Sequence, residues 1–284
     1  MKIRTAVFPV AGWGTRFLPA TKAVPKELLP IVDRPAIQYA VEEAISAGIE
    51  RVVLVTSEHK RSIEDHFDIA ADLEAVLEAR GDIEHLRAVR AVADMVHLVT
   101  VRQKEQLGLG HAVLMARDAV GHEPFAVILP DELVLNTPGC LAQMIKAAEG
   151  LGEKANLIAV EEVPADKTHQ YGICGVGQRN GKMFEVDGMV EKPNPADAPS
   201  SLAIIGRYIF SPKIFEVLER TAGGKNGEIQ LTDAIAQLID LPAQQGGGVL
   251  AVILRGNRYD TGDKLSYLKS VVSIALQRPE FGSE

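Results

Sequence analysis

The sequence begins with a short apolar run, TAVFPV (Thr5–Val10), which leads directly into a glycine-rich and basic stretch, AGWGTRFLPATKAVPKELLP (Ala11–Pro30). An apolar run without polar alternation is typical of a strand that helices cover on both faces. Gly12 and Gly14 have no Cβ, so the backbone N–H groups around them can approach an anionic ligand closely. The stretch therefore predicts an α/β fold with an anion-binding loop after its first strand.

The same loop carries three basic side chains, Arg16, Lys22 and Lys26. A guanidinium group can fork onto two phosphate oxygens, and an ammonium group acts as a point charge. Two glycines alone are equally compatible with a plain turn whose charges are solvated. A dinucleotide-binding fingerprint is disfavoured, because Phe17 replaces the third glycine of G-x-G-x-x-G and Pro19 interrupts the helix that should follow.

Apolar runs and helical patterns alternate along the rest of the chain. Strands are predicted at Thr5–Val10, Arg51–Val55, His97–Val101, Phe125–Leu129, Leu157–Val160, Ala203–Phe210 and Val249–Leu254. Helices are predicted at Ala36–Ala47, Arg61–Phe67, Asp72–Arg80, His111–Ala119, Leu141–Gly150, Pro212–Arg220, Thr232–Ile239 and Lys264–Gln277. This alternation predicts a Rossmann-like, mostly parallel sheet flanked by helices, with a smaller lobe in the glycine-richer second half. In such open sheets, ligands bind at the C-terminal ends of the strands.

The composition limits the classes of partner. The chain has 284 residues, with 38 Asp and Glu against 30 Lys and Arg, and a net charge of −8. This balance argues against nucleic acid or an anionic membrane surface as a partner, because no long-range field attracts a polyanion. A small phosphorylated ligand would need a locally basic pocket instead. The two cysteines, the lack of metal-type Cys/His spacing and the lack of a long apolar span predict a cytoplasmic protein without a membrane segment.

Two motifs place carboxylates after predicted strands. FAVILPDE presents Asp131 and Glu132 at the end of the strand at Phe125–Leu129, and RYDTGDK contains Asp260 and Asp263. Carboxylates at these positions can hold Mg²⁺ against the phosphates of a nucleotide. An isolated Asp after a strand is more often a turn or helix-cap residue, and for Asp260 the two interpretations are equally good. Asp263 is expected to cap the last helix.

Two further motifs offer other kinds of contact. QKEQLGLGHA contains Gln103, whose amide can donate to and accept from a base edge, and Gly108, which permits close approach of a flat ligand. His111 in this motif has no visible partner and is interpreted as structural. MVEKPNP contains Glu191 and Lys192, which could bind sugar hydroxyls and a phosphate, or could form an exposed ion pair on a loop.

The order of these motifs resembles the sugar-1-phosphate nucleotidylyltransferase family. VAGWGTRFLPATKAVPKELLP, GLGHAV, VILPD, MVEKP, GRYIF (Gly206–Phe210) and GEIQLTDAI (Gly227–Ile235) follow in the family's order over nearly the whole chain. The departures are Trp13, where many relatives have a smaller or different side chain, and small differences in YDTGDK. The resemblance implies one domain over 1–284, with a nucleotide-binding part at about 1–155, a sugar-phosphate-binding part at about 156–262 and a C-terminal helix at 263–284. It also implies a homodimer or a homotetramer.

The resemblance further implies an enzyme that transfers a uridylyl group from UTP to glucose-1-phosphate, with Mg²⁺ as cofactor and UDP-glucose and pyrophosphate as products. Family members that use dTTP commonly have Gln at the position of Glu27, so Glu27 favours UTP. A sugar phosphate has a second pKa near ~6 and is largely a dianion at neutral pH, so its in-line attack on the α-phosphorus needs no general base. The alternatives are a thymidylyl- or cytidylyltransferase, and a catalytically silent subunit that binds a nucleotide sugar.

The family's site residues transfer to the matching positions of this sequence. The resemblance implies nucleotide contacts from Ala11, Gly12 and Gly14, and a uracil site bordered by Glu27, Gln103 and Gly108. It implies that the β- and γ-phosphates are held by Arg16 and Lys26, and that Mg²⁺ is held by Asp131 and Asp260. It implies that the phosphate of glucose-1-phosphate is held by Lys192, and that the sugar is contacted by Glu191 and Gly172. The candidate catalytic residues are Arg16, Lys26, Asp131 and Lys192.

Overall fold

The computed structural model describes residues 2–152, 155–180, 183–224 and 227–282. Its strands are β1 (Thr5–Pro9), β2 (Pro30–Ile31), β3 (Arg34–Pro35), β4 (Arg51–Thr56), β5 (His97–Arg102), β6 (Phe125–Ile128), β7 (Glu132–Val134), β8 (Leu157–Glu162), β9 (Gly172–Cys174), β10 (Arg179–Asn180), β11 (Met183–Glu185), β12 (Met189–Glu191), β13 (Leu202–Phe210), β14 (Leu250–Ile253) and β15 (Arg258–Asp260). Its α-helices are α1 (Ala36–Ser46), α2 (Arg61–His66), α3 (Ala71–Arg80), α4 (Ile83–Ala93), α5 (Leu109–Met115), α6 (Arg117–Val120), α7 (Cys140–Ala147), α8 (Lys213–Arg220), α9 (Leu231–Asp240) and α10 (Lys264–Leu276).

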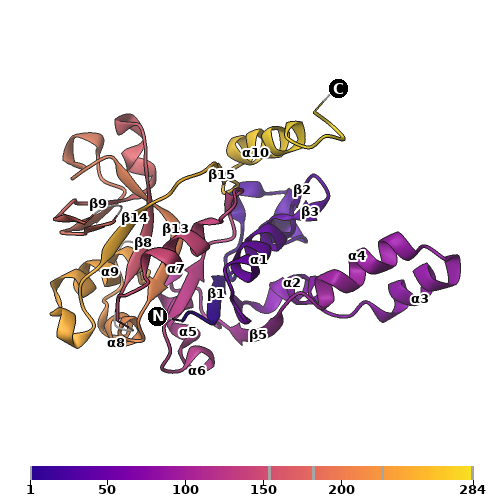
Figure 1. Cartoon of the computed structure of the whole chain (residues 1–284), viewed down its shortest axis with the longest axis horizontal. Helices are drawn as coiled ribbons and strands as arrows, with labels where there is room; N and C mark the ends of the chain where they lie inside the picture. The colour runs from indigo at the N-terminus through magenta and orange to yellow at the C-terminus, as the bar shows by residue number, and fades with distance from the viewer. Residues whose placement is uncertain (1, 153–154, 181–182, 225–226, 283–284) are drawn as a thin grey trace.

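The predicted α/β architecture is confirmed. The described strands form a mixed 11-stranded sheet whose main path is β10-β11-β14-β8-β13-β6-β1-β4-β5, with helices packed around it (Figure 1). β9 and β12 form an antiparallel strand pair, and β9 joins this sheet through β13. Smaller two-stranded sheets pair β2 with β3 and β7 with β15.

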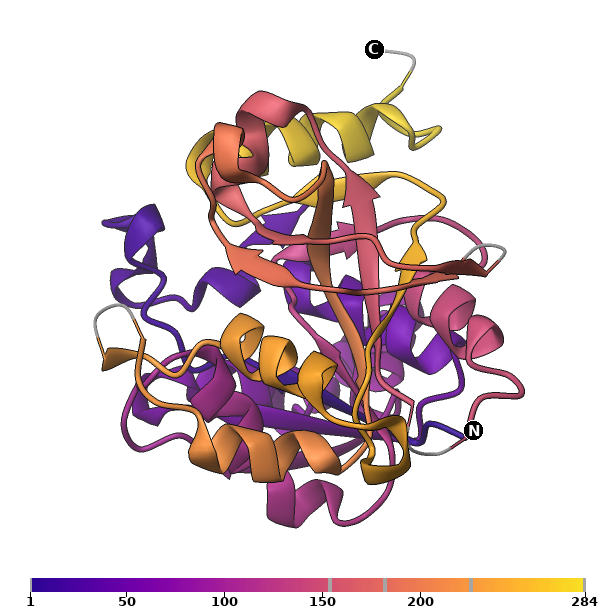
Figure 2. The same cartoon turned by 90° about the vertical axis from the view of Figure 1, so that its left-hand side faces the viewer.

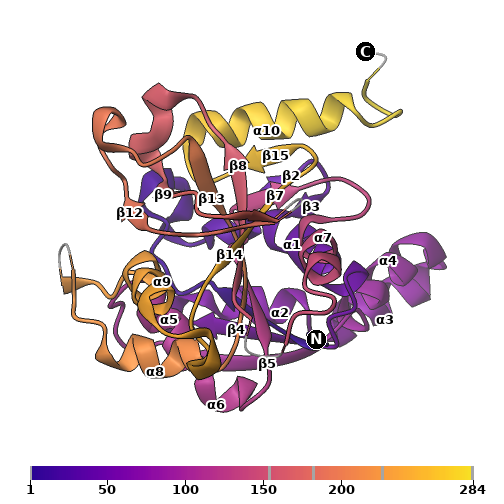
Figure 3. The same ribbon diagram turned by 60° about the vertical axis from the view of Figure 1, so that its left-hand side comes forward.

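The N-terminal part of the sheet is parallel and is buried on both faces. β1 pairs in parallel with β4 and β6, and β4 pairs in parallel with β5. Along β1, Val7 packs into the core under α5, α8 and α9, whereas Ala6 and Phe8 pack into the core under α1, α2 and α7. Figure 3 shows α5, α8 and α9 on one side of the sheet and α1 and α7 on the other. Burial on both faces explains why this strand reads as an uninterrupted apolar run.

β13 joins the two parts of the sheet. It is buried along its whole length and pairs antiparallel with β6 on one edge and with β8 on the other. Gly206 lies in the middle of β13 with φ 62°, and a Cβ there would lie 2.9 Å from the Cβ of Leu129. Only glycine fits this conformation and this close approach. The strand therefore changes register beside β8 without losing its packing against the end of β6.

The β7–β15 ribbon lies just beyond the C-terminal end of β6, and α10 covers it. Ile274 of α10 and Leu133 of β7 share a small core with Ile31 of β2. The N-terminus of α10 is capped as predicted, because Asp263 Oδ1 accepts hydrogen bonds from the backbone N–H groups of Leu265 and Ser266. In Figure 2 this yellow helix lies at the opposite end of the molecule from the orange helices α8 and α9.

Some elements differ from the predicted ones. α4 was not predicted, and with α3 it forms a helical hairpin that projects from the body (Figure 1). Ile83, Leu86 and Val89 of α4 have the spacing of a helical apolar stripe, so the sequence carried a signal for this helix that was missed, although only Leu86 is buried. The helix predicted at His111–Ala119 begins earlier and is divided into α5 and α6. Within the described residues, no helix is long and apolar enough to span a membrane.

Candidate active site

The glycine-rich loop after β1 folds back on itself in three short 3-10 turns, η1 (Thr15–Phe17), η2 (Ala20–Lys22) and η3 (Lys26–Leu28). Gly14 has φ 66°, and a Cβ there would lie 3.3 Å from the Cβ of Lys26. The Thr21 hydroxyl donates to the Gly14 carbonyl at 2.8 Å and closes the fold. A Cβ at Gly12 would meet no atom within 4 Å, so this side of the loop is open.

Lys26 and Asp131 meet at the C-terminal edge of the sheet. The Lys26 ammonium donates to Asp131 Oδ2 at 2.6 Å, and both side chains are about one-fifth to one-quarter exposed. Burial lowers the pKa of Lys26, but the negative charges of Asp131 and Glu27 outweigh burial and hold it above the usual value. Burial raises the pKa of Asp131, but Lys26 outweighs burial and holds it below the usual value. Both groups are therefore charged, and each compensates the other.

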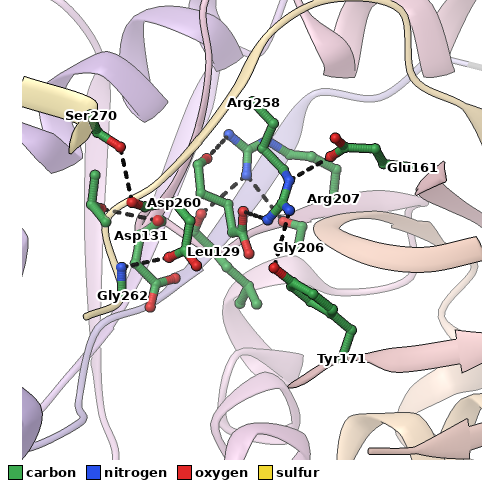
Figure 4. Close-up of polar contacts among 12 residues, drawn as sticks. Leu129, Asp131, Glu161, Tyr171, Gly206, Arg207, Arg258, Asp260, Gly262 and Ser270 are labelled. Carbon is green, nitrogen blue, oxygen red and sulfur yellow. Dashed lines mark hydrogen bonds and ion pairs between the residues drawn. The ribbon is translucent and has the colours of Figure 1, made fainter. Parts of the chain in front are cut away.

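Asp260 lies beside this pair, across the β7–β15 ribbon. A Cβ at Gly262 would lie 3.0 Å from Asp260 Oδ1, 3.3 Å from Arg16 Nη1 and 3.5 Å from Asp131 Oδ2, so three charged groups surround this glycine. Arg16 Nη1 donates to the Gly262 carbonyl at 2.9 Å. The Gly262 N–H donates to Asp260 Oδ1 at 2.7 Å (Figure 4). Burial raises the pKa of Asp260, and the nearby Asp131 carboxylate raises it further.

These carboxylates fit Mg²⁺ chemically. Mg²⁺ is usually bound by one or two carboxylates, with phosphates of the substrate and water completing the octahedron. Asp131 and Asp260 supply two such carboxylates. No group of three or more His, Cys, Asp or Glu side chains in the described part of the chain could form a metal cage without a substrate. The donor set therefore suits an ion that arrives with a phosphate ligand.

Gln103 and Gly108 lie together at the ends of β5 and α5. Gln103 is buried, and its Nε2 donates to the Gly108 carbonyl at 3.3 Å and lies 2.9 Å from His111 Nδ1. His111 therefore has a side-chain partner eight residues away that the sequence did not show, and this contact agrees with a structural role for His111. Gly108 has φ 98°, and a Cβ there would lie 2.8 Å from the Ile229 carbonyl oxygen, so the motif around Ile229 requires this glycine.

Glu27 is part of a buried ion pair. Lys60 Nζ donates to Glu27 Oε2 at 2.7 Å, and the two side chains are 6% and 2% exposed. Burial outweighs the attraction of Glu27 and lowers the pKa of Lys60. The pair joins η3 of the glycine-rich loop to the turn that follows β4. Glu27 is thus fixed in position next to Lys26.

A cavity of about 360 Å³ opens between the glycine-rich loop and the segment after β4. Ala11 and Trp13 line it from one side, and Ser57 and His59 line it from the other. The Trp13 and His59 rings are 5.4 Å apart, and Trp13 is 60% exposed. The Ala11 carbonyl, at the edge of the cavity, accepts a hydrogen bond from Gln106 Nε2 at 2.9 Å.

The predicted sugar-phosphate residues form a second group in and just after the β9–β12 strand pair. Gly172 is paired with Glu191 across the two strands, and a Cβ at Gly172 would lie 3.2 Å from Glu191 Oε2. Glu191 Oε2 accepts a hydrogen bond from the Thr232 hydroxyl of α9 at 2.8 Å. Lys192 is 61% exposed, lies 3.2 Å from Glu191 Oε1 and has a positive φ of 46°. Its backbone N–H donates to the Tyr171 carbonyl, so the strained turn is fixed while the ammonium group is accessible.

Arg258 links the two groups of residues. Its guanidinium donates to Glu132 Oε2 at 2.7 Å, to Glu161 Oε2 at 2.5 Å and to the Tyr171 hydroxyl at 3.3 Å (Figure 4). The guanidinium also lies 5.2 Å from the centre of the Tyr171 ring. Burial raises the pKa of Glu132 to about 7, and the Arg258 charge acts in the opposite direction.

Arg207 supports the same region from inside the protein. It is completely buried, and its Nη2 donates to Glu43 Oε2 at 2.7 Å. It also donates to the backbone carbonyls of Leu129, Gly206 and Glu132 (Figure 4). These bonds hold the end of β6 and the start of β7, and therefore the segment that carries Asp131.

The sequence pattern of the nucleotidyl transferase family matches residues 6–276. The chain belongs to the nucleotidyl transferase family. UTP–glucose-1-phosphate uridylyltransferase of Staphylococcus epidermidis is 48% identical over 283 residues, which cover 100% of this chain and 96% of the relative. A UTP-bound UGPase from Acinetobacter baumannii is 44% identical, with a TM-score of 0.89 and coverage of 99% of this chain and 96% of that one. A UDP-glucose pyrophosphorylase complexed with UDP-glucose is 42% identical, with a TM-score of 0.85 and coverage of 98% and 100%.

In this nucleotidyl transferase, the predicted residues fall into three places. One group, in which the side chains converge, is Arg16, Lys26, Asp131 and Asp260. A second group borders the ends of β1, β4 and β5 and consists of Ala11, Glu27, Gln103 and Gly108. The third group lies in and just after the β9–β12 strand pair and consists of Gly172, Glu191 and Lys192. Sequence reasoning missed the residues that support them. Arg258 and Thr232 lie within quoted motifs but received no role, and Lys60 and Arg207 carry no local signal of their partners.

Proposed function

We propose that this chain is an enzyme that transfers a uridylyl group from UTP to glucose-1-phosphate, with UDP-glucose and pyrophosphate as products. The observation that carries the proposal is the cluster of Arg16, Lys26, Asp131 and Asp260 at one edge of the sheet, together with an accessible Lys192 just after β12. Full-length relatives with uridylyltransferase and UDP-glucose pyrophosphorylase names support the choice of substrates.

The charges suit a reaction between two polyanions. Lys26 and Arg16 are placed to bind the β- and γ-phosphates and to stabilise the charge that develops on the leaving pyrophosphate. Lys192 binds the phosphate of the sugar and reduces its repulsion from the nucleotide. Glu191, held by Thr232, accepts hydrogen bonds from the sugar hydroxyls. Since the attacking sugar phosphate is already a dianion, the protein contributes alignment and charge rather than a general base.

We also propose that Asp131 and Asp260 hold Mg²⁺ together with the nucleotide. A bound Mg²⁺ supplies positive charge to the phosphate oxygens, which stabilises the transition state. The Lys26 ammonium contacts Oδ2 of Asp131, and the second carboxylate oxygen, Oδ1, can bind the ion beside it. The phosphates of the nucleotide attract the same ammonium.

We propose that the nucleotide-binding part of the site is formed by Ala11, Gly12, Gly14, Glu27, Gln103 and Gly108. We propose that the backbone of the loop binds the α-phosphate and the uracil, and that Gln103 and Gly108 border the base. The Glu27 side chain is 2% exposed and paired with Lys60, so its effect on the choice of UTP acts through the position of the glycine-rich loop. We further propose a homodimer or homotetramer. We also propose a cytoplasmic location, which is supported by the two buried cysteines without a disulfide, Cys140 and Cys174.

A nucleotide panel tests the function. Purified protein is incubated with glucose-1-phosphate, Mg²⁺ and each of UTP, dTTP and CTP, and pyrophosphate release is measured. UTP is expected to give the highest kcat/KM. A higher value with dTTP or CTP would overturn the choice of nucleotide, and no release with any of them would favour a silent nucleotide-sugar-binding subunit.

A further inference from the structure

Arg258 has a position that its motif alone does not explain. It is the first residue of β15, and its side chain is only 10% exposed. Its three guanidinium nitrogens donate to side chains from three different segments, Glu132 of β7, Glu161 of β8 and Tyr171 just before β9. A buried guanidinium with this many partners is held in one orientation.

On one side, Arg258 is fixed to the ribbon that carries the metal-binding candidates. β15 pairs antiparallel with β7, so that Asp260 lies opposite Glu132. The Thr261 N–H and hydroxyl both donate to the Asp131 carbonyl, at 2.8 Å and 3.0 Å. Asp131 and Asp260 therefore move as one unit with the backbone of Arg258.

On the other side, Arg258 is fixed to the start of the β9–β12 strand pair, which Lys192 directly follows. The Tyr171 hydroxyl accepts its hydrogen bond, and the Tyr171 ring lies 5.2 Å from its guanidinium carbon. The Tyr171 carbonyl accepts the N–H of Lys192 at 3.0 Å, and the next residue, Gly172, is paired with Glu191. One side chain thus connects the Lys192 turn to the Asp131–Asp260 ribbon.

Lysine could not make the same set of contacts. The guanidinium is planar and presents its N–H groups in fixed directions, whereas an ammonium is a compact point charge. Glu132 and Glu161, from two strands, both form ion pairs with this guanidinium, and its central carbon lies over the Tyr171 ring. The geometry is therefore specific to arginine.

We propose that Arg258 is a positioning residue that sets where Lys192 and Glu191 lie relative to Asp131 and Asp260. The inference rests on the proposed function, in which these two groups hold the two reacting phosphates. Because in-line attack depends on alignment, loss of the Arg258–Tyr171 contact misplaces the sugar phosphate while the nucleotide still binds normally. A misplacement of about 1 Å can lower the rate up to about 100-fold.

The test compares Arg258→Lys, Tyr171→Phe and the double variant with wild type. Arg258→Lys keeps the positive charge beside Glu132, and Tyr171→Phe removes only the hydroxyl. The expected result is a fall in kcat/KM for glucose-1-phosphate, larger for Arg258→Lys, with KM for UTP unchanged. The double variant should lose little more kcat/KM than Arg258→Lys alone, because both single changes break the same contact between Arg258 and Tyr171. Arg90→Lys, on the remote α3–α4 hairpin, is the matched control.

A second readout does not require turnover. Calorimetry should show weaker binding of UDP-glucose, which contacts both groups, and unchanged binding of UTP in Arg258→Lys and Tyr171→Phe. Equal losses for UTP and for the sugar ligands would indicate a merely structural role and would overturn the proposal, as would wild-type values in both variants. If the wild-type protein binds both ligands but releases no pyrophosphate, the proposed function is wrong. The calorimetric comparison of UTP and UDP-glucose binding then still tests the role of Arg258.

Discussion

The buried pair between Lys60 and Glu27 makes a quantitative prediction for the glycine-rich loop. Lys60→Met removes the ammonium that lies 2.7 Å from a carboxylate with a 2% exposed side chain. Leaving one charge of a buried pair without its partner costs about 3–5 kcal/mol. Since whole domains are stable by about 5–15 kcal/mol, this single change removes a large fraction of the free energy of unfolding.

The double variant Glu27→Met with Lys60→Met separates pairing from packing. The lowered pKa of Lys60 means that burial outweighs the attraction of Glu27, so the charged pair itself contributes little net stability. Replacing both charges by apolar side chains should therefore restore most or all of the lost stability.

Urea unfolding followed by circular dichroism measures these free energies, provided that the m value is unchanged. A cost for Lys60→Met below about 1 kcal/mol, which is the range of exposed ion pairs, would refute the buried pair. A double variant as unstable as Lys60→Met would refute the explanation by an unpaired charge.

Three further predictions concern ligands. Lys192→Ala should fold normally, because its ammonium is 61% exposed, but should lose kcat/KM for glucose-1-phosphate; near-normal activity would remove Lys192 from the site. Asp131→Asn should require more Mg²⁺, and an unchanged Mg²⁺ titration of pyrophosphate release would reject the metal assignment. Trp13 is the chain's single tryptophan and lines the cavity beside Ala11, so UTP should change its fluorescence, and Trp13→Phe should abolish this signal. Constant emission at saturating UTP would contradict the assigned nucleotide position.

The central strands could be predicted from the sequence because strands that are buried on both faces lack polar alternation. β1, β4 and β6 are of this kind, and their predicted ranges agree with the structure to within a residue. The short strands around the sugar side could not be predicted, since β9, β12 and β15 have only three residues each. Three residues are too few to show an alternation of apolar and polar side chains, and such strands form only through pairing with distant strands.

The charged groups after predicted strands were the predictable part of the site. Lys26, Asp131 and Asp260 stand next to glycines, prolines and apolar runs that mark strand ends, and the fold places these ends at one edge. The supporting contacts were not predictable. Lys60 meets Glu27 33 positions away and Arg258 meets Glu132 126 positions away, and no local pattern encodes such a pairing.

The central claim is that the sugar phosphate attacks UTP directly, without a covalent bond between the nucleotide and the protein. The most direct measurement is the configuration at the α-phosphorus when a single stereoisomer of UTP with sulfur on that phosphorus is the substrate. A single in-line displacement predicts inversion in the UDP-glucose analogue that forms. Retention would require two displacements through a protein nucleophile and would contradict the account.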